Sequence, residues 1–223
     1  MGAQIPSDTL EDQRLNMVNG QLRTGGVVDK SVLAAFLEIP RERFVPPAFA
    51  SLAYLDRDLP ALNAKSRRLL QPLTLARMLQ AATVSPADRA LDVAGGSGYG
   101  AALLDFLGAD VVLLESDAGA AAAARTALSG RGKVRVVEGP LDSGAANLGP
   151  FDLVVVEGSF GVAPDALIAL LADPGRLVGV DRSVGTPQAV LFEKVNGAVG
   201  RRALFEAGAA PLEAFQPRET FAF

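Results

Sequence analysis

The 223-residue sequence contains no histidine, no cysteine and no tryptophan. Without His or Cys the chain cannot form a Ser-His-Asp or Cys-His catalytic pair, nor a zinc site of ordinary type. A metal would have to be a hard cation bound by Asp and Glu, and we expect none. The available general bases are carboxylates, Lys and Tyr, whose pKa values lie far from neutrality unless strongly shifted. These absences favour chemistry that a bound organic cofactor supplies.

The chain also lacks an excess of positive charge and a long apolar run. Its 21 Lys and Arg stand against 25 Asp and Glu, a net charge of −4, so nucleic acid is not an expected partner. No uncharged apolar stretch is long enough to cross a membrane, and Asp8, Glu11 and Asp12 oppose a signal peptide. We therefore expect a cytoplasmic protein, and the sequence predicts no particular oligomeric state. The one basic cluster, residues 65–68, is interpreted as a solvated loop.

Residues 1–85 are predicted to form a helical and irregular extension without the alternation that marks strands. A first helix would begin at the capping residues Ser7 and Asp8, a second after Asp29, and a third at Pro72, which suits a first helical turn.

Residues 86–223 have a different sequence pattern and are predicted to form a ligand-binding core. Apolar, β-branched runs alternate with helical stretches, which indicates a parallel sheet covered by helices on both faces. The predicted strands are residues 90–93, 111–115, 134–137, 153–156 and 176–180, and the predicted helices are residues 99–108, 117–129 and 164–172. The alternation ends in a predicted antiparallel hairpin that turns at Asn196-Gly197.

A glycine-rich loop follows the first strand of this core. Asp92 and Val93 precede it, and the predicted cofactor-contacting residues in it are Ala94, Gly95, Gly96, Ser97 and Gly98. Glycines let the chain turn sharply and let a ligand approach the backbone, while the next helix presents free N–H groups. A plain tight turn is the alternative interpretation.

Two acidic residues favour a nucleoside ligand at this loop. Glu115 ends the second predicted strand, about 20 residues after the first, where an acid accepts ribose hydroxyls. Asp92 would repel a pyrophosphate but attract a cationic ligand, which favours S-adenosyl-L-methionine over NAD. The alternatives are that Glu115 is a surface acid and that Asp92 is a structural acid facing a helix.

Motifs along nearly the whole chain carry a family resemblance. They are Met17-Val18, Gln21-Leu22-Arg23, Ile39-Pro40-Arg41-Glu42, Phe44-Val45-Pro46, Ala53-Tyr54, Gln71-Pro72, Gly96-Ser97-Gly98-Tyr99, Pro150-Phe151-Asp152 and Gly175-Arg176-Leu177-Val178. With them the chain resembles the protein-L-isoaspartate O-methyltransferases. The resemblance implies a class I methyltransferase fold, α/β and doubly wound: a Rossmann-like seven-stranded sheet with an antiparallel C-terminal hairpin and an N-terminal helical extension. It also implies S-adenosyl-L-methionine as cofactor and L-isoaspartyl residues of damaged proteins as substrate, which is a protein-repair function.

The chain departs from the family pattern at three places. Arg68, Leu69 and Leu70 stand where the family usually has Thr-Ile-Ser, whose Ser contacts the substrate, so the resemblance places these three residues at the substrate. Pro140 replaces an Asp that contacts adenine, so the resemblance places Pro140 and Leu141 beside the cofactor.

Glu157 is the third departure, because it replaces a small residue after the fourth strand of the core. An ionised Glu157 in the ligand crevice would repel an isoaspartyl carboxylate, whereas it could act as general base for an alcohol, phenol or amine. Alternatively it pairs with Arg68 or Arg182 as a structural acid. Carboxyl methylation of isoaspartyl residues is the expected activity. Three alternatives stay open: a same-fold methyltransferase that uses Glu157 as base, a non-catalytic cofactor-binding or regulatory relative and, last, an NAD-dependent oxidoreductase.

Overall fold

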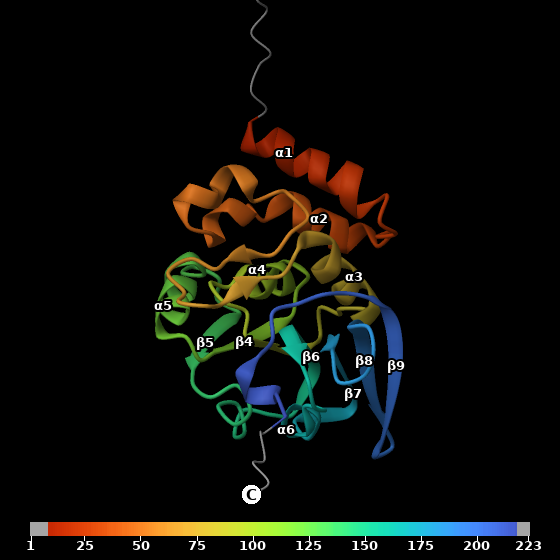
Figure 1. Cartoon of the computed structure of the whole chain (residues 1–223). Coiled ribbons are helices and arrows are strands. Elements are labelled where there is room, and N and C mark those ends of the chain that lie inside the picture. The colour runs from red at the N-terminus through yellow and green to blue at the C-terminus, as the bar shows by residue number, and fades with distance from the viewer. Residues whose placement is uncertain (1–8, 218–223) are drawn as a thin grey trace, which may run out of the picture.

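The structure, a computed structural model, describes residues 9–217 (Figure 1). Its helical elements are α1 (Leu10–Met17), η1 (Val18–Leu22), α2 (Lys30–Glu38), η2 (Arg41–Phe44), η3 (Pro47–Leu52), α3 (Pro72–Ala82), α4 (Tyr99–Phe106), α5 (Ala118–Ala127), α6 (Asp165–Ile168) and η4 (Glu213–Phe215). Its strands are β1 (Leu59–Pro60), β2 (Arg68–Leu69), β3 (Arg89–Val93), β4 (Asp110–Glu115), β5 (Val134–Glu138), β6 (Phe151–Phe160), β7 (Leu171–Asp181), β8 (Gln188–Val195) and β9 (Ala198–Glu206).

Capping residues set where the N-terminal helices begin. Thr9 and Asp12 form a reciprocal capping box at the start of α1, while the predicted caps Ser7 and Asp8 lie outside the described residues. The Asp29 side chain accepts from the N–H groups at the start of α2, as predicted, and α3 begins at Pro72, also as predicted.

Residues 1–85 also contain two short strands that the sequence did not indicate. β1 and β2 pair in antiparallel fashion, and the Ala61 N–H extends the pairing by donating to the Arg67 carbonyl at 3.0 Å. Strands of two residues are too short to show the alternation of apolar and polar positions that marks a strand in a sequence. This small β-hairpin covers the glycine-rich loop, as described below.

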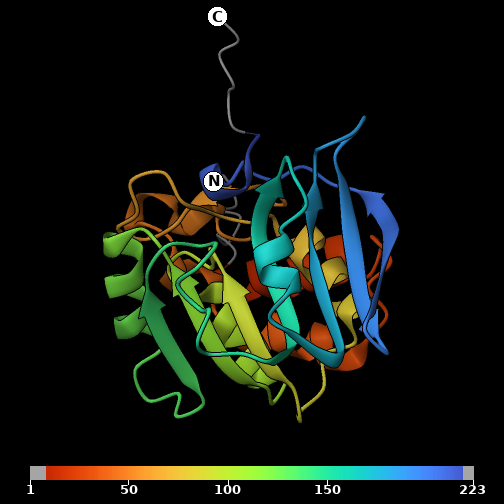
Figure 2. The same ribbon diagram turned by 90° about the horizontal axis from the view of Figure 1, so that it is seen from below.

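The main sheet has seven strands in the order β5-β4-β3-β6-β7-β8-β9, with β5 and β9 at its edges (Figure 2). β5, β4, β3, β6 and β7 pair in parallel, and β8 and β9 add antiparallel pairs. The predicted hairpin is confirmed, because Asn196 and Gly197 both adopt positive φ (52° and 78°) at its turn. The sheet thus has the predicted doubly wound architecture with an antiparallel C-terminal end.

The predicted helix over residues 164–172 is too long. α6 ends at Ile168, and the chain then runs beside β6, where Phe151 pairs with Leu171 and its N–H donates to the Leu170 carbonyl at 2.8 Å. Pairing with β6 therefore competes with the helix and begins β7 at Leu171. β6 is correspondingly longer than the four-residue strand that the sequence predicts.

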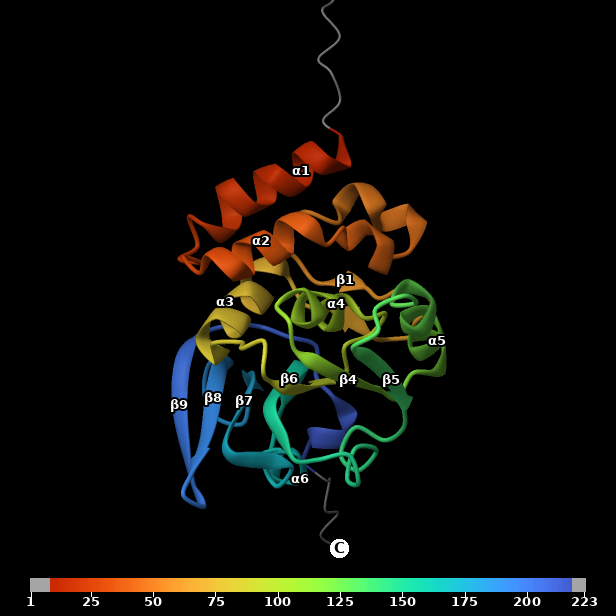
Figure 3. The same ribbon diagram turned by 180° about the vertical axis from the view of Figure 1, so that it is seen from behind.

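Alternate residues of the central strands enter two apolar cores, one on each face of the sheet. On β4, Val111 and Leu113 join the core shared with α3, α4 and the N-terminal helices, whereas Val112 and Leu114 join the core shared with α6 and η4. Figures 1 and 3 show α1 and α2 as an outer layer over α3 and α4, and α6 on the opposite face of the sheet. Within residues 9–217 every helix is too short or too polar to cross a bilayer.

Candidate cofactor and substrate site

Three acidic residues lie on neighbouring strands where β3 and β4 end. The sequence predicted Glu157 after its strand, but it lies inside β6, because β6 continues to Phe160. Asp92 lies near the end of β3, Glu115 ends β4, and Glu157 follows the β6 residue that pairs with Val93. The strand order reverses here: the chain runs from β3 outward through β4 to β5, and then crosses back to β6 on the other side of β3. In open α/β sheets this switch point is where ligands bind.

The glycine-rich loop after β3 is completely buried, because the segment between β1 and β2 lies on it. A Cβ atom added to Gly96, whose φ is +60°, would lie 2.9 Å from the Ala61 Cβ and 3.3 Å from both Arg67 Cγ and a Leu69 methyl. Ser97 bonds the same N-terminal region, since its hydroxyl donates to the Phe44 carbonyl. The predicted loop residues 94–98 therefore contact protein rather than open space.

Glu115 is fully buried, so the interpretation that it is a surface acid is wrong. The guanidinium of Arg67 binds its carboxylate as a fork, with Nε donating to Oε2 and Nη2 to Oε1, each at 3.0 Å. The backbone N–H groups of Gly96, Ser116 and Asp117 donate to the same carboxylate at 2.9, 2.7 and 2.9 Å. A carboxylate offers about four acceptor positions, so these donors saturate Glu115.

The interpretation of residues 65–68 as a solvated loop is wrong for Arg67, whose side chain is only 14% exposed. Tertiary contacts hold its neighbours as well. The Lys65 N–H donates to the Asp117 carboxylate at 2.9 Å, and Arg68 donates to the Asp58 carbonyl at 2.9 Å. The local charge run gave no sign that a buried acid on β4 lies opposite it.

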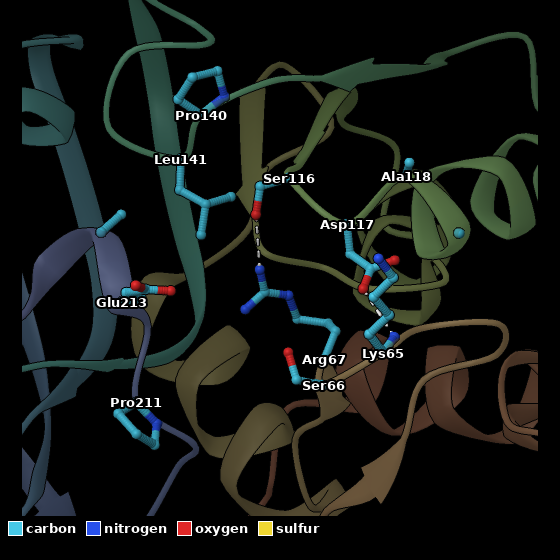
Figure 4. Close-up of a pocket in the computed structure, with 12 residues that line it drawn as sticks. Lys65, Ser66, Arg67, Ser116, Asp117, Ala118, Pro140, Leu141, Pro211 and Glu213 are labelled. Carbon is cyan, nitrogen blue, oxygen red and sulfur yellow. Dashed lines mark hydrogen bonds between the residues drawn. The ribbon is translucent and has the colours of Figure 1, made fainter.

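A cavity of about 710 Å³ opens beside Arg67, at the ends of β4 and β5 (Figure 4). The predicted cofactor residues Pro140 and Leu141 line it opposite Arg67, and Asp117 and Glu213 form parts of its wall. Its full lining is Lys65, Ser66, Arg67, Ser116, Asp117, Ala118, Gly119, Pro140, Leu141, Pro211, Glu213 and Ala214. Small-molecule sites have volumes of roughly 300–1,000 Å³, so the cavity is large enough for a nucleoside.

Asp92 and Glu157 form a second acidic group, on the other side of the glycine-rich loop. All four carboxyl oxygens are buried and form no hydrogen bond of normal geometry with the described residues. Burial raises the pKa of Asp92 well above its usual value, and the charge of Glu157 raises it further. Burial likewise raises the pKa of Glu157 to about 7, although the positive charge of Arg41 opposes that shift.

The two carboxyl groups fill the space that two glycines leave. A Cβ on Gly100 would lie 1.8 Å from a Glu157 carboxyl oxygen, and one on Gly95 would lie 2.3 Å from an Asp92 oxygen. The glycines of this region thus make room for the protein's own acids. Neither acid lines the cavity beside Arg67.

Arg41 and Tyr99 complete this buried group, and sequence reasoning assigned no role to either. The Arg41 guanidinium carbon lies 5.0 Å from the centre of the Tyr99 ring, and both side chains are fully buried. Burial lowers the pKa of Arg41, while Tyr99 and Glu157 oppose that change. Arg41 is therefore the positive charge that acts most strongly on Glu157.

The predicted pairing of Glu157 with Arg68 or Arg182 is wrong, since Glu157 forms no hydrogen bond of normal geometry with either. Leu69 and Leu70, predicted to lie at the substrate, are both buried and do not line the cavity. Within residues 9–217 no three acidic side chains are grouped closely enough to hold a metal ion.

The doubly wound sheet with its antiparallel end is the fold of the class I methyltransferases. A structure described as a Plasmodium falciparum protein-L-isoaspartate O-methyltransferase in complex with S-adenosyl-L-homocysteine superimposes with a TM-score of 0.79 at 19% identity, covering 93% of this chain and all of that one. Another protein-L-isoaspartate O-methyltransferase gives a TM-score of 0.77 at 24% identity over 89% of this chain, which spans only 65% of that longer one.

The chain belongs to the protein-L-isoaspartate (D-aspartate) O-methyltransferase family, whose model matches residues 13–206. A protein-L-isoaspartate O-methyltransferase of Koribacter versatilis is 39% identical over 190 residues, covering 84% of this chain and 83% of the relative. One from Gloeobacter violaceus is 36% identical over 206 residues, covering 91% of this chain and all of the relative.

Proposed function

We propose that this protein is an S-adenosyl-L-methionine-dependent carboxyl methyltransferase that acts on L-isoaspartyl residues of damaged proteins. The observation that carries the proposal is the match of the family model to residues 13–206, which includes both the N-terminal region and the sheet. The relatives named above carry the same activity in their names. We further propose that it acts in the cytoplasm, since a chain without cysteine needs no oxidising compartment.

The residues present are of the right kind to hold the cofactor. Glu115 lies at the end of β4, where its carboxylate would accept ribose hydroxyls, and the cavity beside it would hold the base between Pro140, Leu141 and Ser116. The glycine-rich loop, which would contact the amino-acid part, is covered by the segment between β1 and β2 in the structure. When bound, the cofactor supplies an activated methyl group and its own leaving group.

The chain's part in such a reaction is to position the acceptor and exclude water. An isoaspartyl carboxylate is already ionised at neutral pH, so no general base is needed, which suits a protein without histidine. Alignment of two reactants can lower a barrier by about 7–11 kcal/mol. The family resemblance would put Arg68, Leu69 and Leu70 on the acceptor side, where Leu70 would be an apolar group in place of a hydroxyl.

The repulsion that the sequence predicted between Glu157 and an isoaspartyl carboxylate is weaker than expected. Because its pKa is raised to about 7, it is only partly ionised at neutral pH and repels an acceptor carboxylate less than a fully charged Glu would. Its burial away from the cavity also weakens the case for Glu157 as a general base.

Methyl transfer to a peptide tests the proposal. We expect radiolabelled methyl from S-adenosyl-L-methionine to appear as a base-labile ester on an isoaspartyl peptide, and not on the same peptide with ordinary aspartate. Glu157→Gln should keep this activity, because the amide preserves size and adds no charge. Cofactor binding without ester formation would overturn the proposed substrate.

One observation favours the non-catalytic relative as a second candidate. Arg67 saturates the carboxylate that would bind the ribose, so the described conformation is closed to a nucleoside. Calorimetry that detects no binding of S-adenosyl-L-methionine at millimolar concentration, by the wild-type protein or by a variant with this contact removed, would favour that candidate.

A further inference from the structure

Arg67 lies where a bound nucleoside would have to reach Glu115. Its guanidinium binds the Glu115 carboxylate, and the same residue lines the cavity. Its Nη2 also donates to the Ser116 hydroxyl at 3.1 Å (Figure 4). Glu115 itself is fully buried and does not line the cavity. Arg67 thus forms the wall between a buried acceptor and a space large enough for a ligand.

The donors on Glu115 leave no acceptor position for a hydroxyl group. Three of them are backbone N–H groups that belong to the ends of β3 and β4, and they cannot leave without unfolding the loop. The guanidinium is the only side-chain donor on this carboxylate among the described residues, and Arg67 lines the cavity. A ribose that donates its hydroxyls to Glu115 must therefore displace Arg67.

Backbone contacts to η2, to the glycine-rich loop and to the start of α5 hold the segment between β1 and β2, which carries Arg67. The Leu62 N–H donates to the Phe44 carbonyl at 3.0 Å and to the Ser97 hydroxyl at 3.3 Å. The Lys65 N–H donates to Asp117, and the Asn63 carbonyl lies 2.2 Å from where a Cβ on Gly119 would be. These contacts hold the segment over the glycine-rich loop, and from there the Arg67 side chain reaches the Glu115 carboxylate.

We propose that Arg67 is an intramolecular competitor of the cofactor: its guanidinium occupies the hydroxyl-accepting face of Glu115 and keeps the nucleoside site closed until a ligand displaces it. This inference rests on the proposed function for the identity of the cofactor. Apparent affinity is then the affinity of the open site multiplied by the small fraction of molecules in which Arg67 has left Glu115. Weakening the Arg67–Glu115 contact should raise cofactor affinity.

Calorimetric titration with S-adenosyl-L-homocysteine tests the competition directly. We expect Arg67→Ala to bind at least tenfold more tightly than wild type, a difference of about 1.4 kcal/mol. Arg67→Lys should fall between them, because an ammonium group keeps the charge but lacks the planar fork. Arg125→Ala is the matched control: it also removes one positive charge, from an exposed pair with Glu138, and should bind as wild type does.

A second readout follows Arg67 itself in the wild-type protein. The Nε–H signal of Arg67 should be protected from exchange without ligand and lose that protection when S-adenosyl-L-homocysteine is added. Thermal unfolding of each variant shows whether it folds, and if Arg67→Ala does not, Arg67→Lys and the Nε–H signal decide. Affinity that falls or stays unchanged in the Arg67 variants, or no binding by any variant, would overturn the inference.

Methylation of the isoaspartyl peptide by the same variants separates the two proposals. Tighter binding without methylation would overturn the proposed function and leave the competition intact. Methylation by wild type with no gain in affinity for Arg67→Ala would overturn the competition and leave the function intact.

Discussion

Two acidic groups at the same edge of the sheet are buried to the same degree, but their charges are compensated differently. Glu115 on β4 accepts hydrogen bonds from a guanidinium and three backbone N–H groups. Asp92 and Glu157, on β3 and β6, accept none of normal geometry and face each other and Arg41. Burial alone therefore does not decide how an acid behaves here; the donors that reach it do.

The difference follows from which segments reach each acid. The β1–β2 hairpin brings Arg67 into direct contact with Glu115, whereas η2 brings Arg41 near Glu157 without a hydrogen bond. A buried carboxylate without donors favours its protonated form, so a raised pKa replaces ionic pairing in the second group. The comparison predicts that the first group contributes stability through charge and that the second loses stability when it becomes charged.

The largest expected effect is on the paired acid. Glu115→Gln keeps the size of the side chain but leaves Arg67 without its anion, and we expect the free energy of unfolding to fall by about 3 kcal/mol. Glu138→Gln on β5 is the matched control, because its partner Arg125 lies 3.3 Å away in an exposed pair that should contribute less than about 1 kcal/mol. Urea unfolding at pH 7 measures both; equal losses would contradict the comparison.

The unpaired acids should make stability depend on pH. The pKa of Glu157 is raised from 4.5 to about 7 in the folded state, so the folded protein holds a proton there that the unfolded chain has released. Stability from this group is therefore complete below about pH 4.5 and is lost as the pH rises through 7, by about 3 kcal/mol in all. Urea unfolding between pH 5 and pH 8 measures this decrease.

Substitutions assign that pH dependence. Glu157→Gln should flatten it, and adding Asp92→Asn should flatten it further, because Asp92 titrates in the same direction. The variants leave the other charged residues that face the group unchanged, and these are Arg41, Arg67 and Glu115. The sequence has no histidine that could titrate in this range. If stability still decreases from pH 5 to pH 8 in the double variant, groups other than Asp92 and Glu157 cause the decrease.

The smallest expected effect concerns the space around Glu157. Gly100→Ala places a methyl group on its carboxyl group, and we expect a loss of about 1–2 kcal/mol despite the better helix propensity of Ala. Gly20→Ala is the matched control, since nothing lies within 4 Å of its added Cβ, and it should stabilise slightly. Thermal unfolding measures both, and Gly100→Ala combined with Glu157→Ser should recover most of the loss.

Much of the fold could be predicted because its signals are local. Apolar runs, the cap at Asp29, the proline at the start of α3 and the Asn196-Gly197 turn each depend on a few neighbouring residues. Where distant pairing competes with a local signal, the prediction was wrong: α6 ends early because residues 170–171 pair with Phe151 of β6. The division into residues 1–85 and 86–223 stays a prediction, although both parts contribute to one apolar core.

In the candidate site, too, some features follow from local sequence and others from contacts between distant residues. The sequence by itself indicated that Asp92 and Glu115 lie at or near the ends of strands beside a glycine-rich loop, because apolar runs and glycines are local signals. Only the tertiary structure decided which cation meets which acid. Arg67 and Glu115 are 48 residues apart, and no local pattern encodes their contact. That contact depends on how the N-terminal region folds back over the sheet, and it determines whether the acid at the end of β4 is available to a ligand or already bound by the protein itself.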